Sequence, residues 1–161
     1  MPNWSIVNVA DAPAMQHEVA GASIRLIDEE HVTDVGVNIR VLQPGQPNGK
    51  YHSETVQEDF LVLSGECILI VEDEERHLKA WDFFHCAPGT NHIIVGAGDG
   101  PCAILMAGGR FEGKTTHYPV NEVAARHGVS VTAPVDSGRE AYADLDYDAF
   151  EDAPSAFPFS S

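Results

Sequence analysis

Short apolar segments separated by closely spaced turns dominate residues 35–109, and they constrain the fold more than any other feature of the sequence. The run VGVNIRVL at 35–42 alternates apolar and other side chains with a period of two, which is typical of a half-buried strand. Turn signals such as Ser64-Gly65 separate six or seven such candidates, and no helical period interrupts them. This spacing predicts an all-β domain, an antiparallel sandwich or barrel.

The segments on either side of this region differ from it. SIRLID at 23–28 predicts one further strand after a loose N-terminal lead. PVNEVAARHG has a proline and a glutamate early, basic residues late and a glycine beyond, so one short helix is expected over 119–127. We therefore expect three parts: a lead at 1–21, a barrel at 22–110, and a C-terminal helix with an acidic extension at 111–161.

The extension is acidic and carries scattered aromatic and apolar side chains. We expect it to wrap the barrel or a neighbouring subunit, with disorder of the last ten residues as the competing interpretation. The residues expected to make these contacts are Tyr142, Leu145, Tyr147, Phe150, Phe157 and Phe159. Because natural sheets avoid bare edges, such a cover predicts a homodimer.

The charge balance excludes several classes of partner. The 161 residues carry 25 Asp and Glu against 9 Lys and Arg, a net charge of −16 that repels nucleic acids and anionic membranes. Nothing approaches the roughly 20 apolar residues of a membrane helix, and the first residues lack the pattern of a secretory signal. Cys67, Cys86 and Cys102 lie far apart in apolar sequence, which predicts free thiols and a cytoplasmic protein.

The stretch YHSETVQED places three metal-capable side chains just before an apolar run. On a strand His52 and Glu54 would share one face, with their Cα atoms about 6.7 Å apart. Since ligand bonds are about 2.0–2.2 Å long, one metal could bridge both side chains. Glu58 would lie about 13 Å from His52 on a straight strand, so the chain must bend if Glu58 is to join them. His92 follows a turn much later in the sequence.

These residues resemble the two motifs of the cupin superfamily, G-x5-H-x-H-x3,4-E-x6-G and G-x5-P-x-G-x2-H-x3-N. His52 stands at the first histidine, Glu54 at the second and Glu58 at the glutamate, with six residues before the motif glycine. His92 stands at the histidine of the second motif, after a matching Gly89. The resemblance implies a double-stranded β-helix, or jelly-roll barrel, over roughly residues 22–109.

Several positions depart from the motifs. The glycine and proline departures concern turns, whereas Glu54 in place of a histidine concerns the metal and leaves its identity and the reaction open. The departing residues are Gly45, one residue too far from His52, and Glu54, Trp81, Ala87 and Gly96.

The motif residues predict a divalent transition metal. Two imidazoles and one carboxylate are typical of non-heme Fe(II) oxygenases, whereas Glu54 as a fourth ligand would favour Mn, Fe, Ni or Zn over Cu. Glu54 could instead be a catalytic residue that moves a proton. Because metal ligation needs neutral imidazoles, occupancy is expected to fall at acid pH.

Small cupins include enzymes and binding modules, and fold alone cannot separate them. We expect a metal-dependent enzyme acting on a small oxygenated molecule, with a dioxygenase-type oxidoreductase first. The alternatives are a non-catalytic sensor that binds a small ligand, and a metal-dependent isomerase or lyase.

Other residues near the motifs receive weaker expectations. His85 and Cys86 face opposite ways on a regular strand, so one of them should line the cavity. Pocket or rim positions are expected for Tyr51, Gln57 and Phe60, and surface or turn positions for His17, His31, His77 and His117.

Overall fold

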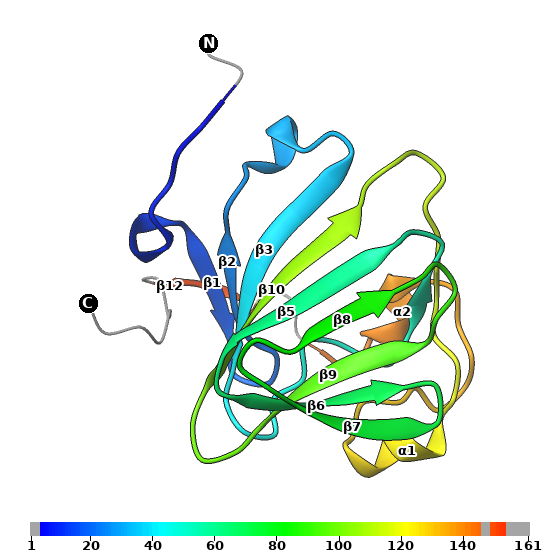
Figure 1. The fold of residues 1–161 in the computed structure, drawn as a ribbon. Coiled ribbons are helices and arrows are strands. Elements are labelled where there is room, and N and C mark those ends of the chain that lie inside the picture. Colours follow the sequence, from blue (N-terminus) through cyan, green and yellow to red (C-terminus); the bar gives the residue numbers. More distant parts are fainter. Residues whose placement is uncertain (1–3, 146–148, 154–161) are drawn as a thin grey trace.

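The computed structural model describes residues 4–145 and 149–153, which fold mainly into antiparallel β-strands (Figure 1). The strands in chain order are β1 (Ala14–His17), β2 (Gly21–Arg25), β3 (Val35–Leu42), β4 (Ser53–Glu54), β5 (Glu58–Ser64), β6 (Glu66–Val71), β7 (Glu74–Lys79), β8 (Phe83–Cys86), β9 (His92–Ala97), β10 (Cys102–Gly109), β11 (Thr116–His117) and β12 (Glu151–Ala153). This is the all-β architecture of a double-stranded β-helix, as expected.

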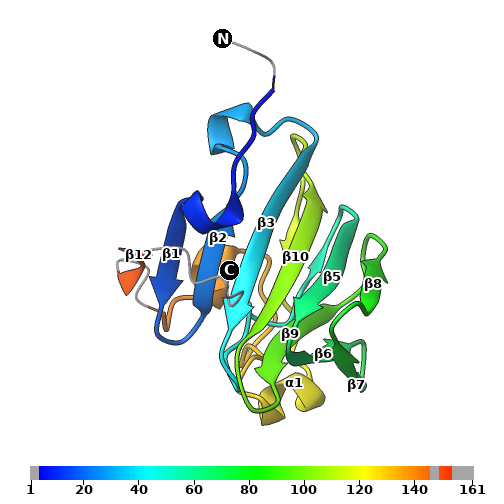
Figure 2. The ribbon, with the colours of Figure 1, turned by 60° about the vertical axis from the view of Figure 1, so that its left-hand side comes forward.

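The strands form two main sheets. The larger has the order β12-β1-β2-β3-β10-β5-β8, the smaller has the order β7-β6-β9, and β4 pairs separately with β11. Figure 2 shows the central strands of the larger sheet side by side. The main core lies between the sheets, because its buried side chains come from both. These are Leu42, Phe60, Val62, Cys67, Leu69, Cys86, Ile94, Cys102 and Ile104.

Strand β3 has the predicted bounds, and its two faces have unlike neighbours. Ile39 and Val41 pack with Ala12 and other residues of the N-terminal segment. The opposite face points toward the inside of the barrel, because Leu42 on that face belongs to the core between the sheets. Arg40 lies on this inner face and donates to the carbonyl oxygen of Ala20 at 2.8 Å. The polar side of the strand is therefore the interior one.

The predicted short helix is α1 (Glu122–Arg126), which begins three residues later than expected. Asn121 caps it, because its side-chain oxygen accepts from the backbone N–H of Ala124 at 2.8 Å. A second helix, α2 (Gly138–Ala141), and two 3-10 turns, η1 (Val9–Asp11) and η2 (Glu29–His31), complete the described elements. No helix among the described residues is long and apolar enough to cross a membrane.

The described part of the tail contacts this chain's own barrel. The hydroxyl of Tyr142 accepts from the backbone N–H of Lys50 at 2.9 Å, and β12 pairs with β1. Phe150 packs on the ring of His17 at 4.6 Å. Tyr147, Phe157, Phe159 and most of the last ten residues lie outside the described residues.

Strands β1 and β12 extend the larger sheet from both ends of the chain. The first lies within the expected lead at 1–21 and the second within the expected extension at 111–161. The sheet therefore includes residues beyond 22–110, and the three-part division remains a prediction.

We predict that Gly65→Ala destabilises the fold strongly. Gly65 has a φ of +72°, and a Cβ there would stand 2.5 Å from the carbonyl oxygen of Pro101, which is backbone and cannot move aside. Gly113 has a φ of +87° and open space around it, so Gly113→Ala is the matched control. We expect a loss of about 3 kcal/mol for Gly65→Ala and about 1 kcal/mol for the control, measured by urea unfolding. Equal losses would contradict the steric argument.

The homodimer stays a prediction, and the structure suggests where to test it. The free edge strand β8 begins with Phe83, whose exposure is 62%, and follows Trp81, whose exposure is 74%. We expect the dimer mass by light scattering at micromolar protein, and a shift toward monomer in Phe83→Asp. Phe111→Asp changes a comparably exposed loop residue and serves as the control. A monomer mass for the unaltered protein would refute the dimer.

Candidate metal centre

Three separate segments bring the candidate ligands together. His52 lies just before β4 and forms an isolated antiparallel bridge with His92, the first residue of β9. The chain then bends at residues 55–57, where Thr55 bonds with Thr115, and Glu58 opens β5. The bend required by the sequence spacing is present, and it turns Glu58 back toward the two histidines.

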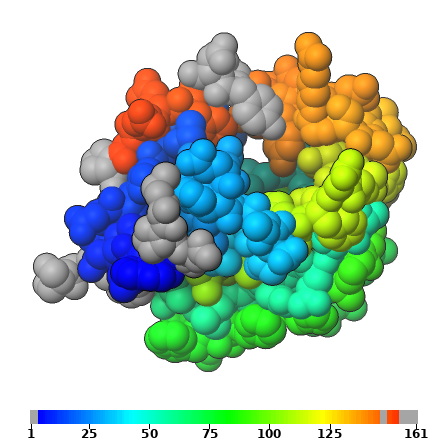
Figure 3. All heavy atoms as spheres, turned by 90° about the horizontal axis from the view of Figure 1, so that it is seen from above, coloured from blue at the N-terminus to red at the C-terminus, as the bar shows by residue number. Residues whose placement is uncertain are grey.

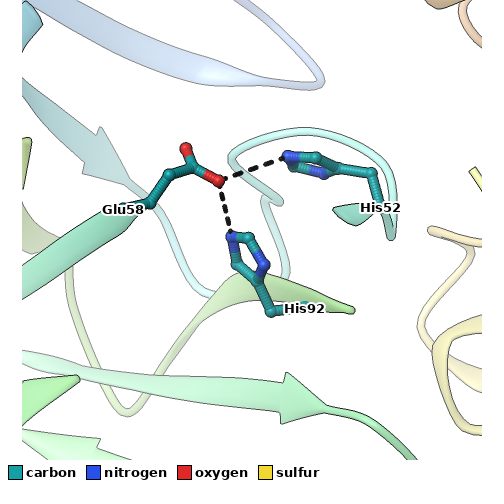
Figure 4. Close-up of side chains that lie close together, drawn as sticks. All are labelled: His52, Glu58 and His92. Carbon is teal, nitrogen blue, oxygen red and sulfur yellow. Dashed lines mark ion pairs between the residues drawn. The ribbon is translucent and has the colours of Figure 1, made fainter. Parts of the chain in front are cut away.

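The three side chains converge on one point (Figure 4). The Oε2 atom of Glu58 lies 3.4 Å from Nε2 of His92 and 3.9 Å from Nε2 of His52. One potential ligand atom from each residue lies within 4.8 Å of the others. This is a two-histidine, one-carboxylate arrangement inside the mouth of the barrel.

Hydrogen bonds fix the orientation of both imidazoles. Nδ1 of His52 lies 2.6 Å from the carbonyl oxygen of Lys50, and Nδ1 of His92 lies 3.1 Å from that of Thr90. A carbonyl can only accept, so each Nδ1 carries the proton and each Nε2 presents a lone pair toward Glu58. Burial lowers the pKa of both histidines, which keeps the rings neutral.

Glu58 adds a third hydrogen-bond acceptor to the two imidazole Nε2 atoms, and none of the three side chains offers a donor to the others at this point. Its Oε2 is buried and accepts no hydrogen bond from the described residues. Burial, and then the nearby charge of Glu54, raise the pKa of Glu58, so the ionised form is costly there. Two imidazole lone pairs and a carboxylate facing one another repel unless a cation lies between them. The residues present therefore fit a divalent metal ion.

Glu54 lies beside the three converging residues and is not one of them. Its Oε1 is 4.0 Å from Nε2 of His52, while its Oε2 pairs with Nζ of Lys114 at 2.6 Å. The β4–β11 pairing holds this arrangement, because Glu54 pairs with Thr116 two residues beyond the lysine. Sequence reasoning missed Lys114, since no motif spacing marks it. A ligand role for Glu54 stays a prediction.

Cys86 and His85 face opposite ways, as expected. Cys86 is buried with its Sγ 3.3 Å from Nδ1 of His92, on the side of the ring away from Glu58. Burial raises the pKa of this thiol to about 12, so it stays protonated. His85 points outward and pairs with Asp59 at 2.7 Å. Cys86 therefore contacts the candidate ligand His92 at the ring nitrogen that does not face Glu58.

The remaining candidates have mixed outcomes. Phe60 is buried with its ring 5.2 Å from that of His92, so it walls the site. Tyr51 packs into the cluster under α1, and its hydroxyl donates to the carbonyl of Glu72 at 2.6 Å. Gln57 is exposed. His17, for which a surface or turn position was expected, lies at the β1–β2 turn but is buried, and its Nδ1 accepts from backbone N–H groups of that turn.

Comparison with known proteins places this geometry in a family. Residues 38–108 match the family model of the cupin domain. This central region of the chain is a cupin domain. No curated protein sequence matches it.

Solved structures support the same assignment. A cupin-superfamily sugar phosphate isomerase from Silicibacter pomeroyi superposes with a TM-score of 0.67 at 19% identity, over 98% of both chains. The polyketide cyclase RemF from Streptomyces resistomycificus gives 0.58 at 16% identity, over 66% of this cupin and 79% of its own chain. A protein from Acidithiobacillus ferrooxidans, whose name proposes a sugar phosphate isomerase, gives 0.54 at 20% identity. That alignment covers 60% of this cupin and 65% of the relative, less than two thirds of its length. At these identities the likeness shows a shared fold.

We predict that protein purified without chelator contains close to one transition metal ion per chain. His52→Ala and His92→Ala should abolish metal binding, and Glu58→Ala should weaken it strongly, because each substitution removes one of the three converging candidate ligands. Elemental analysis and metal titration measure both effects, and the metal-free protein should melt at a lower temperature. His85→Ala removes an exposed neighbouring imidazole and is the control. Failure to load any transition metal at neutral pH would end this prediction.

Proposed function

We propose that this cupin is a metal-dependent enzyme that moves a proton within a small hydroxy-carbonyl compound, an isomerase or lyase. The observation that carries the proposal is the Glu54–Lys114 pair beside the candidate ligands. A carboxylate placed next to a metal site, yet engaged by a lysine, is suited to proton transfer. The full-length likeness to a protein named as a sugar phosphate isomerase supports the same class.

The candidate ligands His52, Glu58 and His92 would hold the divalent ion, and Glu54 can also reach a compound bound there. When bound, the metal supplies Lewis-acid polarisation of the substrate's carbonyl oxygen. Glu54 would accept a proton from the hydroxyl-bearing carbon beside that carbonyl and return it to the former carbonyl carbon. The hydroxyl proton would move to the former carbonyl oxygen, so atoms balance and no oxidant is needed. Lys114 orients the Glu54 carboxylate, because its Nζ lies 2.6 Å from Oε2.

The barrel wall beside His92 is aromatic. Phe60 and Phe84 stack at 5.5 Å, and both rings approach His92. Excluding water strengthens every electrostatic interaction at the site. We expect the substrate to be a small polar molecule.

A dioxygenase is the second candidate, and one specific observation favours it. The converging set of two histidines and one glutamate leaves further coordination positions open, which is typical of non-heme Fe(II) oxygenases. This reaction would consume oxygen, whereas the isomerase or lyase would not. A non-catalytic sensor would bind a ligand without any turnover.

Deuterium exchange distinguishes these alternatives. We expect the metal-loaded protein, kept free of oxygen in deuterated water, to incorporate deuterium beside the carbonyl of a substrate found in a panel of aldoses, ketoses and their phosphates. Glu54→Gln should lower the exchange rate by about 10²–10⁴-fold while retaining metal, because it removes the proton acceptor. Nuclear magnetic resonance measures the exchange, and elemental analysis the metal.

Glu112→Gln alters an exposed carboxylate near Lys114 and is the matched control for this experiment. Oxygen uptake equal to substrate loss would favour the dioxygenase, and binding with neither exchange nor oxygen uptake would favour the sensor. Loss of metal in Glu54→Gln would instead make Glu54 a ligand.

A further inference from the structure

The inner face of the larger sheet opens into a cavity of about 390 Å³ at the barrel mouth. Polar and charged side chains from β2 and β3 line it, among them Ser23, Arg25 and Asn38, and Arg110 joins them from the end of β10. The space-filling view from above shows a hollow between the light-blue and yellow-green segments of the chain (Figure 3). The site already described does not account for these residues.

Two arginines in this cavity are unusual for so acidic a chain, which has only 9 Lys and Arg residues. Arg25 lies 3.7 Å from Glu29, whose side chain is 86% exposed, so the pairing is loose. Arg110 donates to the carbonyl oxygen of Gly109 at 3.0 Å, and no described carboxylate lies within ion-pair distance of it. The guanidinium of Arg110 is therefore available to an anion.

A pair of glycines positions Arg110. Gly36 of β3 and Gly108 of β10 are cross-strand partners, and the arginine side chain folds back over both. A Cβ on Gly36 would stand 3.1 Å from Nε of Arg110, and one on Gly108 would stand 3.2 Å from its Nη1. The space that holds the guanidinium exists because neither residue has a side chain.

The same glycine connects the cavity with the candidate metal centre. The point where a Cβ on Gly108 would stand lies 3.6 Å from Oε1 of Glu58 as well as 3.2 Å from Arg110. Arg110 and Glu58 therefore both lie next to Gly108.

We propose that Arg110, with Arg25, binds the oxyanion end of the substrate, either a phosphate or a carboxylate. The guanidinium fork matches both groups by paired hydrogen bonds. In the proposed function, this end of the substrate is an anchor that places the rest of the molecule over Glu58. Only that anchoring role rests on the proposed function. Anion binding itself does not require the metal.

Three probes with one carbon skeleton test the proposal on the full-length protein after chelation and dialysis. We expect glycerol 3-phosphate or glycerate to bind in isothermal titration calorimetry, and neutral glycerol not to bind. Preference for the first identifies a phosphate site, and preference for the second a carboxylate site. Arg110→Ala should weaken binding at least tenfold, and Arg110→Lys should recover only part of it, because the fork is lost.

Two further variants separate a built site from general charge. Arg126→Ala removes an exposed arginine on α1 with the same change in net charge, and it should leave binding unchanged. Gly36→Ala retains both arginines but fills the space beside the guanidinium, and it should weaken binding severalfold. Equal effects of Arg110→Ala and Arg126→Ala, or equal binding of glycerol, would overturn the proposal. Because the chelated protein is used, these outcomes are independent of whether metal or turnover is found.

Discussion

Three hydrogen-bond acceptors that face one point inside an apolar barrel are the constraint on which the rest of the site depends. Two imidazole nitrogens and one carboxylate oxygen so close together, away from water, would be stabilised by a divalent cation between them. Every neighbouring feature maintains that arrangement. The carbonyls of Lys50 and Thr90 fix the ring orientation, and Cys86 and Phe60 pack against His92.

The strand pattern was readable because alternation and turns are local properties of the chain. Strand β3 has the bounds that VGVNIRVL indicated, and Asn121 caps the short helix that the pattern of 119–127 indicated. Which side of a strand faces inward is decided by tertiary packing. The polar face of β3 lines the barrel interior because the N-terminal segment covers its apolar face.

The sequence predicted the site residues that belong to a motif spacing, and it did not predict the others. His52, Glu58 and His92 were identified from separate segments, and the structure brings them together. Lys114 and Arg110 belong to no spacing pattern, and they reach the site only because β10 and β11 return the chain to the barrel mouth. His17 lies at a turn, one of its two expected positions, but no local pattern predicted that it would be buried there.

The short connection after β10 carries both Arg110 and Lys114: Lys114 pairs with Glu54, and Arg110 folds back over Gly36 and Gly108. Its far end is held by only two pairs of residues between β4 and β11, while its middle, at Gly113, has open space around it. Changes of length or composition there would shift two side chains at once: Arg110, which we propose binds the substrate's oxyanion, and Lys114, which pairs with Glu54. For an engineer, this one loop is where selectivity could be redesigned without rebuilding the sheets.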